Sequence, residues 1–118
     1  MQVGIDIVEI ERFREVDFKK FIEKYLTENE MKYLLNKHDK YETIAGIYAC
    51  KEAVLKAFKI GIGNGVKLKE IEILHENNMP ILNKNEIVTK LMKERDLIDI
   101  DINISHSEIN AIAICVIN

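Results

Sequence analysis

The sequence predicts an α+β fold in which a mainly antiparallel sheet packs against helices. Three patterns support this prediction. Apolar and polar residues alternate over positions 98–105, which is typical of a half-buried strand. Residues 43–59 carry apolar side chains at helical spacing. Asn77 and Asn78 separate two short apolar segments, which indicates a hairpin turn.

Length and composition place the chain among compact globular proteins. Its 118 residues fit one domain over 1–118, and its 47% hydrophobic residues argue against disorder. The net charge of −3 argues against a general nucleic-acid binder, and no apolar run approaches the ~20 residues that cross a bilayer. Because the first residues resemble no export signal, we expect a cytoplasmic protein in which Cys50 and Cys115 are free thiols.

The chain should begin with a strand. Residues 3–8 are apolar on both faces except for Asp6, which predicts a strand buried on both sides that carries one carboxylate. Residues 11–25 are charged and amphipathic, with aromatic side chains at near-helical spacing.

Two helices should follow. Thr27 and Glu30 form a capping-box pattern, which predicts a short helix that runs to Leu35. The amphipathic pattern over 43–59 predicts a longer helix, and Gly61 should end it.

The second half of the chain alternates strands with one helix. Residues 70–74 and 80–82 should pair as the hairpin, and residues 85–95 should form a helix. The alternating strand at 98–105 follows. Residues 109–117 are apolar on both parities, so we expect other helices or a second subunit to cover both faces of that strand.

Polar groups at apolar positions are the candidates for function. Asp6 lies in a buried strand, where a carboxylate is costly unless it is paired, hydrogen-bonded or bound to a metal. Lys51 falls in the middle of the apolar stripe of the 43–59 helix, so it needs an anionic partner or must extend outward. Glu52 and Lys56 lie one turn apart at the edge of that stripe.

Each of these residues also has a structural interpretation. Asp6 could cap a helix or pair with an arginine, and Glu52 and Lys56 could be an exposed i,i+4 pair. Taken together, however, two carboxylates and two lysines, Lys51 and Lys56, are what a site for a divalent cation and a pyrophosphate requires.

Three further positions carry weaker signals. His106 continues the core parity of the 98–105 strand into a tight turn, where it could reach a ligand or be a buried structural histidine. His75 lies in polar surroundings and should face solvent. Gly61, Gly63 and Gly65 form a loop after a helix, where the dipole does not favour an anion, so a flexible connector is the simpler interpretation.

Three segments together resemble the holo-[acyl-carrier-protein] synthases, the short type of 4′-phosphopantetheinyl transferase. They are residues 4–10, residues 48–58, and residues 104–107 with 111–113. The most specific element is the Lys-Glu-Ala-x-x-Lys motif at 51–56, with Tyr48 three residues before it. The order and spacing of these segments span almost the whole chain.

The resemblance implies a reaction and a site. The phosphopantetheine arm of coenzyme A would move to a serine of apo acyl carrier protein, with release of adenosine 3′,5′-bisphosphate, a step that supports fatty acid biosynthesis. Asp6 and Glu52 would bind Mg²⁺, or alternatively Mn²⁺, and Lys56 would lie against the phosphates. The coenzyme A site would be completed by further residues: Lys51, Gly61, Gly63, Gly65 and His106.

The resemblance also implies partners. The short members form trimers with sites between subunits, which suits the apolar strand at 109–117. An arginine that matches Arg12 meets the acidic carrier protein, and we extend this expectation to the other cations of the same segment. They are Arg14, Lys19, Lys20 and Lys24. Without the resemblance, this segment would be interpreted as a solvated helix face.

Two positions depart from the family pattern. Lys59 stands where a glycine usually follows the Ala-Phe pair, so the start of the loop could differ, and Cys50 replaces an alanine. Two alternative functions also stay open at this point. A metal-dependent phosphohydrolase could use Asp6 and Glu52, and a non-enzymatic assembly domain would explain the apolar strand but not the buried carboxylate.

Overall fold

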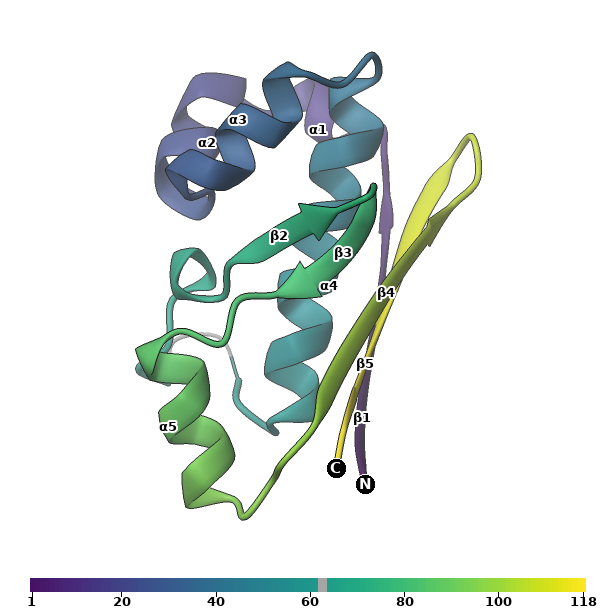
Figure 1. Ribbon diagram of the computed structural model, residues 1–118. Helices are drawn as coiled ribbons and strands as arrows, with labels where there is room; N and C mark the ends of the chain where they lie inside the picture. Colours follow the sequence, from purple (N-terminus) through teal and green to yellow (C-terminus); the bar gives the residue numbers. More distant parts are fainter. Residues whose placement is uncertain (62–63) are drawn as a thin grey trace.

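The computed structural model describes residues 1–61 and 64–118 and contains two antiparallel sheets and five α-helices within those residues (Figure 1). In chain order, the elements are β1 (Gln2–Glu9), α1 (Arg12–Glu15), α2 (Phe18–Tyr25), α3 (Glu28–Leu35), α4 (Lys40–Ala57), the 3₁₀ turn η1 (Leu68–Glu70), β2 (Ile73–Glu76), β3 (Met79–Leu82), α5 (Glu86–Glu94), β4 (Ile100–His106) and β5 (Asn110–Ile117).

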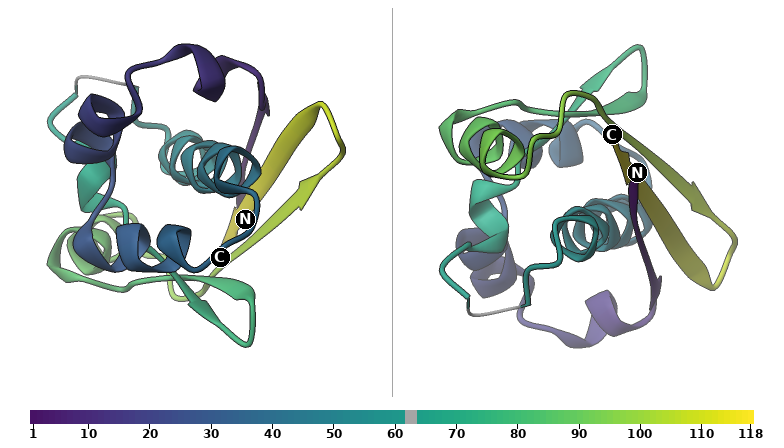
Figure 2. Two further views of the ribbon diagram at one scale, coloured as in Figure 1. Left: turned by 90° about the horizontal axis from the view of Figure 1, so that it is seen from above. Right: turned by 90° about the horizontal axis from the view of Figure 1, so that it is seen from below.

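Helix α4 lies at the centre of the molecule. Seen along its axis, the sheet of β1, β4 and β5 lies on one side, and the other helices and the β2–β3 hairpin surround the rest (Figure 2). Twelve of its eighteen residues are therefore buried, including Lys51 and Glu52. The charged residues on the buried sides of this helix must find partners inside the fold.

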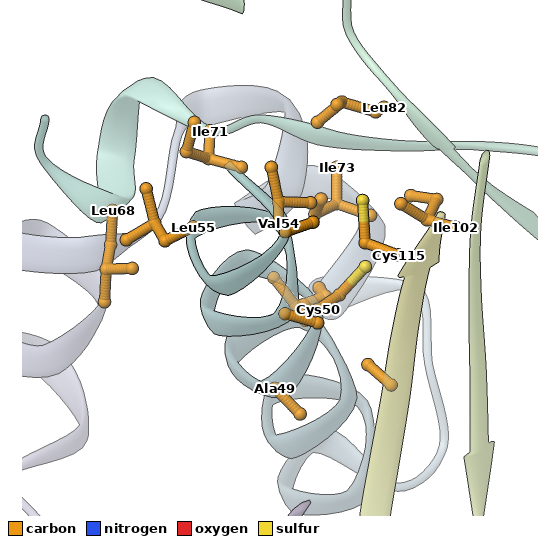
Figure 3. Packing of buried hydrophobic residues seen from close by; sticks show 14 of the residues in the cluster. Ala49, Cys50, Val54, Leu55, Leu68, Ile71, Ile73, Leu82, Ile102 and Cys115 are labelled. Atoms are coloured by element: carbon orange, nitrogen blue, oxygen red, sulfur yellow. The ribbon is translucent and has the colours of Figure 1, made fainter. Parts of the chain in front are cut away.

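The three-stranded sheet has the order β1-β5-β4, and both pairings are antiparallel. Gln2 lies opposite Ile117, so the two chain ends lie side by side (Figure 1). The inner face of β5 presents small side chains to α4, among them Ala113 and Cys115, which are buried. Figure 3 shows Cys115 packed beside Cys50 of α4. Both cysteines are free thiols, as expected.

The outer face of this sheet is apolar and exposed. On β1 and β5 it carries Val3, Ile5, Ile7, Ile112 and Ile114, which are between 36% and 61% exposed. The prediction that residues 3–8 are buried on both sides is therefore wrong for a single copy of the chain. Only the inner face of β1 packs against α4, and the outer face of β5 is likewise uncovered.

The C-terminus of α4 differs from the prediction. The helix ends at Ala57, and Lys59 rather than Gly61 takes the left-handed conformation, with φ of 62°. The Ile60 N–H donates to the Leu55 carbonyl at 2.9 Å and the Lys59 N–H to the Lys56 carbonyl at 3.0 Å. These two hydrogen bonds form a Schellman motif, which normally has glycine at this position.

Most other predicted elements are confirmed, with shifted bounds. Thr27 and Glu30 make the capping box of α3, and Asn77 and Asn78 form the hairpin turn with positive φ. The 11–25 stretch is divided into α1 and α2, because Asp17 caps a new helix. The strand predicted at 70–74 begins only at Ile73, after η1.

Across the described residues, none of the helices combines the length and apolar character that a membrane crossing requires.

Candidate active site

The close approach of β1 to α4 positions the first site residue. A Cβ atom on Gly4 would lie 1.9 Å from the Ala53 carbonyl oxygen and 2.5 Å from the Ala57 nitrogen, so only glycine fits there. Asp6 lies two residues further along β1 and therefore on the same, inner face. Its side chain is only 14% exposed.

Asp6 and Lys56 form an ion pair between β1 and α4. The Lys56 Nζ lies 2.9 Å from Asp6 Oδ1 and donates a second hydrogen bond to the Ile5 carbonyl at 3.1 Å. About half of the Lys56 side chain remains exposed. This ammonium is thus held at the carboxylate yet remains accessible to an incoming anion.

Glu52 lies one turn before Lys56 on α4 and is 7% exposed. Its Oε1 is buried and has no hydrogen-bond partner. Burial raises the pKa of Glu52, and the nearby Asp6 carboxylate raises it further. A buried carboxylate oxygen without a partner, beside a second carboxylate, is suited to bind a hard cation.

Two carboxylates alone do not complete a cation site. Within residues 1–61 and 64–118, no group of three or more His, Cys, Asp or Glu side chains could hold a metal ion. Mg²⁺ is usually bound through one or two carboxylates, with water and substrate phosphates as the other ligands. The pair of Asp6 and Glu52 fits that pattern.

Glu52 lines a cleft of about 470 Å³ between α2, α4 and the segment that leads into η1. The cleft walls come from Lys24, Tyr25, Tyr48, Leu55, Gly65, Val66, Lys67 and Leu68. The structure thus brings Gly65 and Glu52 together at one cleft. Gly61 does not line this cleft, and Gly63 lies outside the described residues. Lys67 is a cation at the cleft that sequence reasoning missed, although it closely follows the glycines.

The coenzyme A role predicted for Lys51 does not fit the structure. Its side chain is 0% exposed, and its Nζ donates to Glu30 Oε1 at 2.8 Å and to the Leu68 and Ile71 carbonyls. Burial lowers the pKa of Lys51, and Glu30 opposes this effect. All three N–H groups are engaged inside the protein, so none is free for a phosphate. The anionic partner that Lys51 required is the capping-box residue Glu30.

His106 is separated from the carboxylate pair in one copy of the chain. Its Nε2 lies 2.9 Å from Glu42 Oε1 of α4, so His106 lies on the α4 side of the sheet, as its parity predicts, but half of its side chain is exposed at the end of β4. Glu42 and Glu52 are ten residues apart on α4, or about 15 Å along the helix axis. His106 instead lines a second, smaller hollow.

The basic segment follows β1 and reaches the cleft only at its last cation. Arg14 pairs with Glu11 at 3.3 Å and lies over the Tyr41 ring at 4.5 Å, whereas Arg12, Lys19 and Lys20 are exposed. Lys24 lines the cleft. Burial raises the pKa of Tyr48 in the cleft wall, and the Arg12 guanidinium opposes that shift.

A nearly buried carboxylate, a strand-borne aspartate and an accessible lysine beside a cleft define a site suited to phosphoryl transfer. The chain belongs to the 4′-phosphopantetheinyl transferase superfamily, because the model of that family matches residues 2–115.

Among its relatives is the holo-[acyl-carrier-protein] synthase of Clostridium perfringens, which is 40% identical over 98% of this chain and 91% of that protein. The enzyme of Finegoldia magna is 33% identical over 99% of this chain and 95% of its own length.

Solved structures agree with this assignment. The holo-[acyl-carrier-protein] synthase of Helicobacter pylori in complex with coenzyme A has a TM-score of 0.84 and 32% identity, covering 98% of this chain and 99% of that one. The Neisseria meningitidis enzyme has a TM-score of 0.88 and 25% identity, covering 99% and 97%. The predicted fold class and family are therefore confirmed.

Proposed function

We infer that this chain is a holo-[acyl-carrier-protein] synthase. It transfers the phosphopantetheine group of coenzyme A to a serine of apo acyl carrier protein. The observation that carries this function is the Asp6–Lys56 ion pair beside Glu52, which lines the cleft, in a fold shared with synthases that include a coenzyme A complex. In the reaction, the serine oxygen forms a bond to the phosphorus that bears pantetheine, and adenosine 3′,5′-bisphosphate leaves with the bridging oxygen.

We propose that Asp6 and Glu52 hold Mg²⁺, with Mn²⁺ as the alternative cation. The unpartnered Oε1 of Glu52 and its proximity to Asp6 support this assignment. A bound cation would neutralise charge on the pyrophosphate. Lys56, held at Asp6 but half exposed, would contact the phosphates and stabilise the charge that develops on the leaving group.

The glycine segment and the basic segment receive the two substrates in this proposal. Gly65, with Gly61 and Gly63 before it, would line the coenzyme A cleft. Arg12 and its neighbours would orient the acidic carrier protein, since Arg12 is exposed and Lys24 of the same segment lines the cleft. The remaining cations of this set are Arg14, Lys19 and Lys20.

We propose a homotrimer with sites between subunits. One copy separates His106 from the carboxylate pair, and in this assembly a second copy would supply His106 to the coenzyme A that is bound at the pair. The exposed outer face of β1 and β5 offers the apolar surface that such a contact buries. We further propose that the chain acts as one domain in the cytoplasm, where its two free thiols would stay reduced.

Mass spectrometry of the carrier protein tests this function directly. Apo acyl carrier protein, coenzyme A and Mg²⁺ are incubated with the enzyme, and the carrier should gain the mass of one phosphopantetheine group. A phosphohydrolase would instead release product without any change in the carrier, and an assembly domain would leave both substrates unchanged. Either result would overturn the proposed function.

Substitutions at the carboxylate pair test the metal site. Asp6→Ala and Glu52→Ala should each lower kcat by about 100-fold or more, because the pyrophosphate loses charge stabilisation. Their melting temperatures should stay near that of the wild type, since Asp6 pairs with a half-exposed lysine and Glu52 Oε1 has no hydrogen-bond partner to lose. Glu94→Gln on α5, an exposed carboxylate, serves as the control and should keep full activity. Activity that survives both alanine substitutions would contradict the assignment.

A further inference from the structure

Lys51 and Glu30 form an ion pair that is completely removed from solvent. Both side chains are 0% exposed, and Lys51 Nζ lies 2.8 Å from Glu30 Oε1. The proposed transfer reaction does not use this ion pair. Lys51 faces away from Asp6 and Glu52, and all of its N–H groups already donate to protein acceptors.

The pair joins four elements through hydrogen bonds. Lys51 of α4 donates to the carbonyl of Leu68 at 3.0 Å and to that of Ile71 at 2.8 Å. Glu30 of α3 accepts from the Thr27 N–H at 2.8 Å and from the Ile73 N–H at 2.8 Å. The backbone on either side of η1 is therefore fixed to α4 and α3 at a single buried point.

This point lies directly behind the wall of the cleft. Leu68 accepts from Lys51 and also lines the cleft opposite Leu55 and Glu52. Figure 3 shows Leu68 and Ile71 packed against Leu55 and Val54 of α4. The position of residues 64–68 relative to Glu52 thus depends on the hydrogen bonds of Lys51.

Stability alone does not explain the choice of charged residues. Replacing a buried ion pair with well-packed apolar side chains is often neutral or stabilising. Apolar side chains, however, cannot direct hydrogen bonds to two particular carbonyl groups. The Lys51 ammonium therefore fixes the position of the segment that contains the Leu68 and Ile71 carbonyls.

We propose that Lys51 is a positioning residue, anchored by Glu30, that holds the 64–71 wall of the coenzyme A cleft in register with Glu52. This inference rests on the proposed function, because it assumes that the cleft receives coenzyme A. Lys51 acts through the backbone of Leu68 and Ile71 and does not touch the substrate.

Two single variants separate positioning from general stability. Lys51→Met removes both hydrogen bonds to the wall, whereas Glu30→Gln keeps the ammonium and its two carbonyl acceptors. Each variant leaves the other member of the pair as an uncompensated buried charge. Both melting temperatures should therefore fall by about 10 °C or more. Calorimetric titration with coenzyme A and Mg²⁺, well below these temperatures, then compares their affinities.

The dissociation constant for coenzyme A should rise about tenfold in Lys51→Met and stay within about twofold of wild type in Glu30→Gln. In steady-state assays, the KM for coenzyme A should follow the same pattern. The kcat should change little, because Asp6, Glu52 and Lys56 do not depend on the wall. Equal affinities in both variants, or losses that follow the melting temperatures alone, would overturn the proposal.

A double variant and hydrogen exchange keep the test decisive if a single variant does not fold. Lys51→Met with Glu30→Gln leaves no buried net charge and should fold, yet it should retain the weakened affinity. Without any ligand, amides of residues 64–72 should exchange faster in this variant than in the wild type. Unchanged exchange and affinity would overturn the positioning role. If the wild type itself does not bind coenzyme A, the proposed function fails instead.

Discussion

Lys51 and Lys56 occupy one helix five residues apart, and the fold gives them opposite roles. At 100° per residue their side chains point in directions about 140° apart. Lys56 therefore meets Asp6 at an accessible edge, whereas Lys51 points into the space between α3 and η1. Residue type and motif alone do not distinguish two such lysines, because the distinction depends on what covers each side of α4.

His75 shows the same dependence on surroundings. It was expected to face solvent, but its ring stacks on Tyr33 with centroids 3.6 Å apart, and its Nδ1 is buried without a partner. Burial, followed by the nearby Lys37 charge, lowers the pKa of His75 to about 4. The neutral imidazole is therefore the form that the fold accepts at neutral pH.

This pKa shift predicts a pH dependence of stability. Between pH 6.5 and about 4 the unfolded chain binds the proton at His75 and the folded chain does not. The free energy of unfolding should therefore fall as the pH is lowered through this window. Urea denaturation at several pH values should show a smaller fall for His75→Phe, which keeps the stack on Tyr33. Identical pH profiles for the two proteins would exclude His75 as the cause.

At the scale of elements, the sequence predicted most of what local patterns determine. Capping, alternation and turn residues placed the α3 start, β4 and the β2–β3 turn to within a few residues, because each depends on residues that are close in sequence. The candidate site also combines residues that the sequence identifies with pairings that depend on tertiary packing. Polar residues at apolar positions identified Asp6, Glu52 and Lys51 as candidates, but the pairings of Asp6 with Lys56 and of Glu30 with Lys51 each join two elements whose packing no local pattern specifies.

The C-terminus of α4 yields a prediction because Lys59 occupies a glycine position. A non-glycine residue in the left-handed region costs about 1–2 kcal/mol. Lys59→Gly should therefore raise the free energy of unfolding by about 0.5–1 kcal/mol, after the greater freedom of glycine in the unfolded chain is deducted. Urea denaturation measures the gain. Lys59→Ala is the matched control and should show no such gain, because alanine keeps the Cβ. If Lys59→Ala gained as much stability as Lys59→Gly, the cause would be the lost charge and not the backbone conformation.

At the scale of the whole molecule, charge is unevenly distributed. The chain carries a net charge of −3, yet the segment after β1 concentrates cations and ends at the cleft with Lys24. Long-range attraction of this kind acts mainly on association rates and is screened over about 8 Å at physiological ionic strength.

Reversal of Arg12 and Arg14 to Glu should therefore raise the KM for the carrier protein about tenfold at low salt, with little effect on the KM for coenzyme A. The difference from wild type should shrink as salt is added. The control reverses Lys90 and Lys93 on α5, which makes the same change in net charge away from the cleft. If the KM for the carrier stayed unchanged, the basic segment would be a solvated helix face without a role in carrier binding.

The apolar outer face of β1 and β5 predicts assembly. Ile5 lies opposite Ile114 and Ile7 opposite Ile112, so the exposed side chains form one continuous patch. Sedimentation at micromolar concentration should give three times the chain mass of 13.7 kDa. Ile5→Glu should give single chains, whereas Met79→Glu, at an exposed position on the hairpin, should leave the assembly intact. A monomeric wild type would contradict the proposal.

Mixing two inactive variants tests whether neighbouring copies share a site. Asp6→Ala and His106→Ala should each impair every site of a trimer made of one variant. If each site takes Asp6 from one copy and His106 from the next, about one quarter of the sites in randomly mixed trimers regain both residues. Mixing the variants after mild unfolding and refolding should therefore restore activity to about that fraction of wild type. If each copy instead used its own Asp6 and His106, every site would lack one of them and mixing would restore nothing.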